Sequence, residues 1–162
     1  MQLPLKLARG IIQALKIDQP PIDIDAVIAY VAKDHDTSIQ LEKHNFIDKV
    51  SGAHLSKGDK HLIAYNRDHH PHRQRFTIAH ELGHLLLEHA DLRNNEDDYS
   101  TKNPEETAAN KFAAELLVPL EFLKKDFVAG IKDVKVLAQR YMVSEEMVWW
   151  RIMDTGLLRK IK

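Results

Sequence analysis

Two histidines and a glutamate within residues 80–84 are the side chains of this sequence whose types and spacing most directly indicate chemistry. The segment His80-Glu81-Leu82-Gly83-His84 places its histidines four residues apart. On a helix, that spacing puts both side chains on one face, with Cβ atoms ~5–6 Å apart. Two imidazoles so placed can bind one metal ion, typically zinc, and the glutamate after the first histidine can take a proton from a water molecule beside it. The pattern predicts a hydrolytic metal site with His80 and His84 as ligands and Glu81 as general base.

A catalytic zinc site needs a third protein ligand and an open position. Acidic and histidine side chains further along the chain offer candidates, namely Glu105, Glu106, Asp97, Asp98 and nearby histidines. Glu106 is the best placed, because it precedes Asn110 by four residues and both would share one helix face. Glu106 could bind the metal while Asn110 accepts a hydrogen bond from the free N–H of a ligating imidazole. Glu106 could instead form a capping box with Asn103, and spacing alone leaves both readings open.

The expected reaction is peptide hydrolysis, which also needs a group that stabilises the tetrahedral oxyanion. The polar candidates are His61, Tyr65, His69, His70, His72, Arg73 and Tyr99. For each of them a solvated surface position is the alternative. The histidine-rich run at 69–72 is interpreted as a surface loop rather than a second metal site. His89 follows His84 by five residues, which does not return it to the ligand face of a continuous helix, so we expect it outside the site.

Periodic patterns along the chain predict the elements that must hold this site. Apolar residues recur at helical spacing in several segments, separated by residues typical of turns. The predicted helices cover about residues 4–16, 24–33, 74–89, 104–118, 120–128, 133–141 and 145–154. Alternating or β-branched patterns predict strands at about 37–42, 50–55 and 60–65. The polar stretch 67–73, which contains Pro71, predicts a loop before the helix that carries the two histidines.

Together these elements predict an α+β fold. We expect a helical domain with a small antiparallel three-stranded sheet packed on the helix of His80 and His84, and a C-terminal helix pair. No repeat, low-complexity tract or linker is visible, so one domain should span residues 1–162. Within it, residues 1–128 would hold the sheet and the site helices, and residues 129–162 would form a pair similar to a helix-turn-helix.

Length and composition exclude several classes of protein. A chain of 162 residues can bury a core without disulfides or metal. Its hydrophobic fraction of 44% and charged fraction of 29% are typical of a globular protein, and no apolar run approaches the ~20 residues of a membrane span. The lack of cysteine fits a reducing cytosol. A formal net charge of −1 argues against binding driven by nucleic-acid phosphates, so we expect a cytoplasmic protein with no membrane contact.

Two segments resemble the ImmA/IrrE family of metallopeptidases, zinc peptidases of the gluzincin type. Residues 75–84, RFTIAHELGH, are similar to the signature helix of that family. Residues 106–119, ETAANKFAAELLVP, are similar to its second motif, E-x-x-A-N-x-F-A-A-x-L-L-M-P, with Val118 in place of methionine. Looser matches lie at 63–66, 137–144 and 156–157. The resemblance covers about residues 60–158, whereas residues 1–50 share only the outline of helix, helix and strand.

The resemblance implies that His80, His84 and Glu106 hold one zinc ion per chain, with Glu81 as the general base. It favours the ligand role of Glu106 over the capping role, and it implies a bacterial or phage protein inside the cell. Relatives are typically associated with helix-turn-helix repressors, which they inactivate by cleavage or relieve by a less direct route. Some lie in operons that resemble toxin–antitoxin pairs. The implied function is zinc-dependent endopeptidase cleavage of a repressor or antitoxin.

The sequence also allows two other functions. The chain could be a non-catalytic zinc protein that binds a repressor or antitoxin stoichiometrically. It could also be a DNA-binding module, because residues 133–154 read as helix, turn and helix. The second of these helices begins with Glu145 and Glu146, whose charge repels phosphate. Trp149 and Trp150 follow and suit a core or a protein contact, so direct nucleic-acid binding is not expected.

Overall fold

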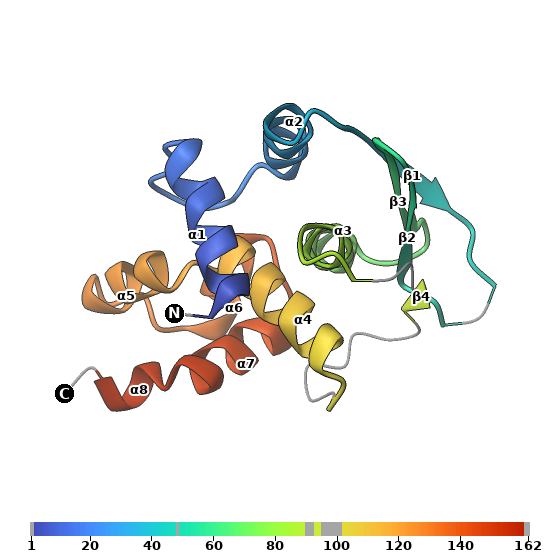
Figure 1. Ribbon diagram of the computed structural model, residues 1–162. Coiled ribbons are helices and arrows are strands. Elements are labelled where there is room, and N and C mark those ends of the chain that lie inside the picture. Colours follow the sequence, from blue (N-terminus) through green and yellow to red (C-terminus); the bar gives the residue numbers. More distant parts are fainter. Residues whose placement is uncertain (1, 48, 90–92, 95–101, 161–162) are drawn as a thin grey trace.

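The computed structural model describes residues 2–47, 49–89, 93–94 and 102–160, and it confirms the α+β class (Figure 1). The helices are α1 (Leu3–Ala14), α2 (Ile24–Asp34), α3 (Pro71–Leu86), α4 (Pro104–Leu117), α5 (Leu120–Val128), α6 (Val134–Tyr141), α7 (Glu145–Thr155) and α8 (Leu157–Lys160). The strands are β1 (Ser38–His44), β2 (Gly52–Lys57), β3 (Lys60–Asn66) and the short β4 (Arg93–Asn94). Among the described residues, none of these helices is long and apolar enough to cross a membrane.

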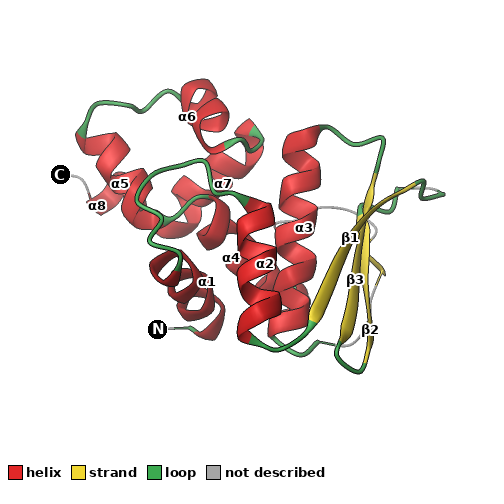
Figure 2. Ribbon diagram, turned by 90° about the horizontal axis from the view of Figure 1, so that it is seen from above, coloured by secondary structure: helices red, strands yellow, loops and turns green. Residues whose placement is uncertain are grey.

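Helix α3 lies between the sheet and the other helices, as the two views show (Figures 1 and 2). One side of α3 packs against β2 and β3, and another packs against α4. Every residue from 76 to 84 is therefore buried, including both histidines and the glutamate of the proposed site. The expectation that the sheet packs on this helix is confirmed. The metal-binding pattern thus lies inside the protein rather than on a solvated helix surface.

The sheet is mixed, so the expectation of an antiparallel sheet is wrong in one pairing. The strand order is β1-β3-β2-β4; β3 pairs antiparallel with β2 but parallel with β1. Strand β3 therefore lies between β1 and β2, which are consecutive in the sequence but do not pair with each other. The apolar run around Ile63 then occupies the more protected middle position. The limits of the three predicted strands agree with the structure to within a few residues, and the two-residue β4 adds a fourth strand that was not predicted.

Helix α3 begins and ends earlier than its pattern predicted. The imidazole of His70 accepts a hydrogen bond from the backbone N–H of His72 at 3.1 Å, and Pro71 occupies the first turn. Proline suits that position because its missing N–H would have no partner there. Residues 71–73 are therefore helical rather than part of a loop. At the other end the helix stops at Leu86, and Glu88 adopts a positive φ of 57°.

A buried ionic cluster fixes helix α4, which supplies one side of the site. The carboxylate of Glu115 on α4 contacts the guanidinium of Arg151 on α7 and lies 2.8 Å from Nε of Arg9 on α1. Arg151 also donates from Nε to the carbonyl oxygen of Val118, at 3.0 Å. Buried charges need partners of this kind, because an unpaired charge in the interior is strongly destabilising. The N-terminal and C-terminal helices thus hold α4 in one position.

Candidate metal centre

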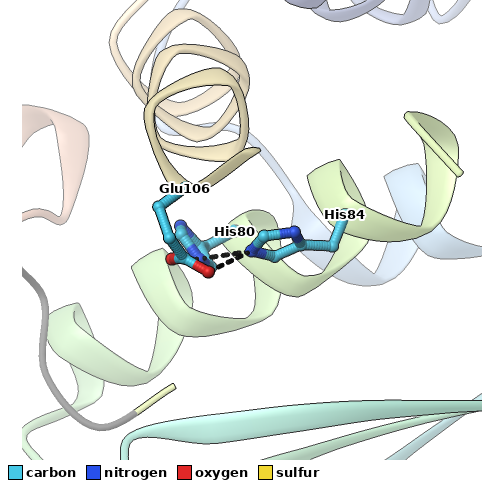
Figure 3. Close-up of side chains that lie close together, drawn as sticks. All are labelled: His80, His84 and Glu106. Atoms are coloured by element: carbon cyan, nitrogen blue, oxygen red, sulfur yellow. Dashed lines mark hydrogen bonds and ion pairs between the residues drawn. The ribbon is translucent and has the colours of Figure 1, made fainter. Parts of the chain in front are cut away.

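The side chains of His80, His84 and Glu106 converge where α3 meets the first turn of α4 (Figure 3). Nε2 of His80 lies 3.1 Å from Oε2 of Glu106, and Nε2 of His84 lies 3.3 Å from Oε1. The two Nε2 atoms are 2.9 Å apart. Both imidazoles are buried, whereas the Glu106 side chain keeps 20% of its surface exposed. Two nitrogens and one carboxylate therefore face a common point with one side near solvent.

This donor set fits a divalent cation. Two neutral imidazoles with Nε2 atoms this close can share at most one proton between those nitrogens, whereas one cation can accept both lone pairs. Two histidines and a glutamate form an established ligand set of catalytic zinc, with a fourth position left open. In the part of the chain that the structure describes, no other group of three histidine or acidic side chains converges in this way. The histidines of residues 69–72 thus form no second metal group there.

Burial and hydrogen bonding have opposite effects on the pKa of Glu106. Burial alone would raise the pKa of this carboxyl group, but hydrogen bonds with His80 and His84 outweigh that effect and hold its pKa well below its usual value. The carboxylate is therefore charged at neutral pH. The backbone is capped separately, since Oδ1 of Asn103 accepts hydrogen bonds from the N–H groups of Glu105 and Glu106. The Asn103 cap of α4 thus coexists with a Glu106 carboxylate turned toward the imidazoles.

A close approach of α3 and α4 brings the three side chains together. A Cβ atom added at Gly83 would lie 3.0 Å from Cδ1 of Phe112 and 3.3 Å from the Cα and carbonyl oxygen of Ala109. Gly83 is three residues after His80, and Ala109 is three residues after Glu106. The contact is therefore one helical turn from the proposed ligand residues on each helix. The absence of a side chain at Gly83 lets the helices come near enough to share one ion.

We expect Gly83→Ala to weaken metal binding and to destabilise the protein. Alanine favours a helix over glycine by about 1 kcal/mol, but overpacking a tight contact costs about 1–3 kcal/mol. Gly10→Ala in α1 is the matched control, because no atom lies within 4 Å of its added Cβ; it should stabilise the chain. Thermal unfolding with and without zinc, and zinc titration, measure both effects. Equal behaviour of the two variants would contradict the assigned helix contact.

Asn110 and His89 lie near the ligands in different ways. Asn110 is buried on α4, one turn after Glu106. The second ring nitrogen of His84, Nδ1, lies 2.8 Å from Nδ1 of His89. Nδ1 of His80 is buried and has no hydrogen-bond partner among the residues that the structure describes. The proposed support of an imidazole by Asn110 stays a prediction.

His89 reaches His84 because α3 ends at Leu86. The helical periodicity that excluded His89 from the site therefore does not apply to it. Burial lowers the pKa of His89, and the neighbouring His84 lowers it further.

Two of the candidate oxyanion stabilisers contact serine hydroxyl groups. Nδ1 of His61 lies 2.9 Å from the Ser56 hydroxyl, and Arg73 donates to the Ser51 hydroxyl at 3.0 Å. Tyr65 lies on β3, where burial and Asp25 raise its pKa. His69, His70 and His72 lie at or just before the start of α3, and Tyr99 lies outside the described residues. The role of each of these residues as an oxyanion stabiliser stays a prediction.

The histidine at position 54 belongs to the site although no sequence pattern marked it. His54 lies on β2, and its Nδ1 is 3.0 Å from Oε2 of Glu81; both side chains are buried. Its ring stacks on that of His84, with centroids 5.7 Å apart and planes at 11°. The contact joins residues on a strand and a helix that are far apart in the chain. The only sequence signal would have been a histidine on the inward face of a predicted strand.

Comparisons with known proteins agree with this arrangement. The family model described as the IrrE N-terminal-like domain matches residues 32–153. The radiation response metalloprotease IrrE of Deinococcus deserti is 41% identical over 70 residues, which cover 40% of this chain and 25% of that protein. A solved Mycobacterium tuberculosis transcriptional regulator has a TM-score of 0.64 at 18% identity, covering 92% of this chain and 46% of that chain. At this identity, the likeness to the solved structure shows a shared fold alone.

Proposed function

We propose that this chain, which belongs to the IrrE N-terminal-like domain family of metallopeptidases, is a zinc-dependent endopeptidase acting on a protein partner. The observation that carries the proposal is the convergence of His80, His84 and Glu106, with Glu81 next to the first ligand. The chain spans a quarter of the length of the curated relative that it matches, so the activity is a property to be tested on this chain itself.

In the proposed reaction, His80, His84 and Glu106 would hold one zinc ion. Zinc bound by such a set acidifies a water molecule and polarises the carbonyl of a peptide bond. Glu81 would accept the proton of that water and deliver it to the nitrogen of the leaving amine. The charged carboxylate of Glu106 would offset part of the positive charge, and burial of both imidazoles keeps bulk water away from the ligand atoms.

The protein partner that we propose is a helix-turn-helix repressor or antitoxin. The resemblance of residues 75–84 and 106–119 to the ImmA/IrrE motifs supports this choice, because that family is associated with such repressors. Such a partner would place the reaction in the cytoplasm, which agrees with a chain that has no cysteine. Direct DNA binding is not proposed, since exposed Glu145 and Glu146 begin α7, the second helix of the C-terminal pair.

Incubation with the repressor encoded beside the gene tests the proposed activity. We expect zinc-loaded protein to convert the repressor into two fragments whose masses sum to the intact repressor plus one water molecule. A chelator in excess should stop the reaction, and added zinc should restore it, because the ligands alone supply no catalyst. Intact mass spectrometry follows both products. Cleavage that persists in excess chelator would contradict the mechanism, and a stable complex without cleavage would favour stoichiometric binding.

A further inference from the structure

We infer that His54 is a positioning residue that holds the carboxylate of Glu81 in its working orientation. The inference rests on the proposed peptidase function, because it assigns His54 a task in that reaction. Nδ1 of His54 lies 3.0 Å from Oε2 of Glu81. The exposed fractions of the two side chains are 1% and 0%. Water therefore does not compete for this hydrogen bond, which is effectively stronger in such surroundings than in solvent.

The chemistry of the pair fixes which group donates. A general base must be ionised, and an ionised carboxylate only accepts hydrogen bonds. Nδ1 of His54 must then carry the hydrogen and donate it to Oε2 of Glu81. In the proposed reaction, the carboxylate held in this way would take the proton of the reacting water. The hydrogen bond from His54 thus fixes the carboxylate through Oε2.

The residues around His54 and Glu81 further restrict the orientations of these two side chains. The ring of His54 stacks on the ring of His84, one of the proposed metal ligands. The donor that holds Glu81 is therefore supported by the same imidazole that would bind zinc. On the strand, a Cβ atom at Gly52 would lie 3.4 Å from Oε1 of Glu81 and would clash with Cγ2 of Thr77. Strand β2 thus lies directly on the general base, with Gly52 beside one oxygen and His54 beside the other.

A regular strand makes His54 a suitable group for this task. His54 is paired with Ile63 in the antiparallel β2–β3 ladder, and Ile63 is fully buried. Groups on strands and helices hold their positions more closely than groups on loops. A free glutamate side chain samples several rotamers, and only some of them present an oxygen to a reactant. Fixing one rotamer before the substrate binds is the contribution that we assign to His54.

Two substitutions at position 54 separate the hydrogen bond from the volume of the side chain. His54→Leu keeps an apolar group of similar size without a donor, and His54→Asn places an amide N–H near the position of Nδ1. We expect kcat for repressor cleavage to fall about 10–100-fold in the leucine variant, the range typical of groups that orient catalytic side chains. KM and bound zinc should stay close to wild type, whereas the melting temperature of the leucine variant should fall, because the buried carboxylate of Glu81 loses a hydrogen-bond partner. The asparagine variant should recover much of the lost kcat.

His35→Leu is the matched control, because His35 is an exposed histidine that follows α2, outside the site. It should leave kcat unchanged. Equal kcat in wild type, His54→Leu and His54→Asn would overturn the inference while leaving the peptidase function intact. A loss of kcat in both variants with no recovery by asparagine would also overturn it, since packing rather than donation would then explain the loss.

The ring of His54 offers a readout that does not depend on turnover. Nitrogen-15 NMR of the histidine side chains distinguishes the two positions of the ring hydrogen, and it applies to the full chain with or without zinc. We expect a hydrogen on Nδ1 of His54 that exchanges slowly with water, and faster exchange in Glu81→Leu. A ring hydrogen on Nε2 alone would overturn the inference even if the leucine variant failed to fold. If wild type cleaves nothing yet shows the Nδ1 hydrogen, the peptidase proposal fails and the hydrogen bond stands.

Discussion

Glu81→Gln is expected to abolish peptide cleavage while leaving zinc bound at one ion per chain. Glutamine has nearly the same shape as glutamate but cannot accept the proton of the reacting water. General bases contribute typically 10²–10⁴-fold to a rate, so kcat should fall by roughly that factor. The metal should stay, because the proposed ligand atoms belong to His80, His84 and Glu106, whereas the carboxylate of Glu81 contacts His54. Zinc analysis and cleavage rates on the same preparation test both halves of the prediction.

The same variant separates catalysis from binding in the cell. If relief of repression requires cleavage, cells that carry Glu81→Gln should show none. Relief that survives in this variant would mean that the zinc protein acts by binding its partner stoichiometrically. Cleavage at the wild-type rate in the purified variant would exclude Glu81 as the general base. The assay in cells thus tests whether relief of repression requires cleavage. The assay on the purified variant tests whether Glu81 is the general base.

Glu106→Gln should lower zinc affinity by more than the ~10–100-fold typical of changes just outside a metal's ligands. The charged oxygens of Glu106 lie 3.1 and 3.3 Å from the Nε2 atoms of the two histidines, so the substitution would remove the proposed carboxylate ligand and its negative charge together. The backbone cap of α4 should survive, because Asn103 provides it. Zinc titration with a competing chelator measures the loss, and circular dichroism checks that the helices remain.

Glu105→Gln is the matched control for that experiment. Glu105 is the exposed neighbour of Glu106 in the same first turn, and it is outside the group that could hold a metal. Removing its charge should change zinc affinity far less. Equal losses in the two variants would show a general effect of charge rather than coordination. Unchanged zinc affinity in Glu106→Gln would show that Glu106 does not bind the metal.

The parts of the site that depend on local geometry could be predicted from the sequence. His80 and His84 share a helix face because helical spacing alone places them there. Helical spacing alone could not predict the position of Glu106, since that position depends on how closely α4 approaches α3 at Gly83. Spacing alone left Glu106 undecided between ligand and cap, and the resemblance to known motifs favoured the ligand role. The packing of the sheet on the motif helix also followed from the apolar pattern.

The contacts that sequence reasoning missed depend on distant pairings or on the end of a helix. The parallel pairing of β1 and β3 arises because the chain passes over one strand, and strand patterns do not encode their neighbours. The contact of His54 with Glu81 depends on the register of that same sheet against α3. His89 was excluded by a helical period that no longer applies beyond Leu86. Each error lies where tertiary packing decides the geometry.

Diffraction from crystals of the zinc-loaded protein, recorded on both sides of the zinc absorption edge, tests the proposed metal centre most directly. We expect one anomalous peak per chain, about 2.0–2.2 Å from Nε2 of His80, Nε2 of His84 and a carboxylate oxygen of Glu106. A peak bonded to other residues, or zinc-saturated crystals with no peak between α3 and α4, would contradict the site and the hydrolytic function proposed from it.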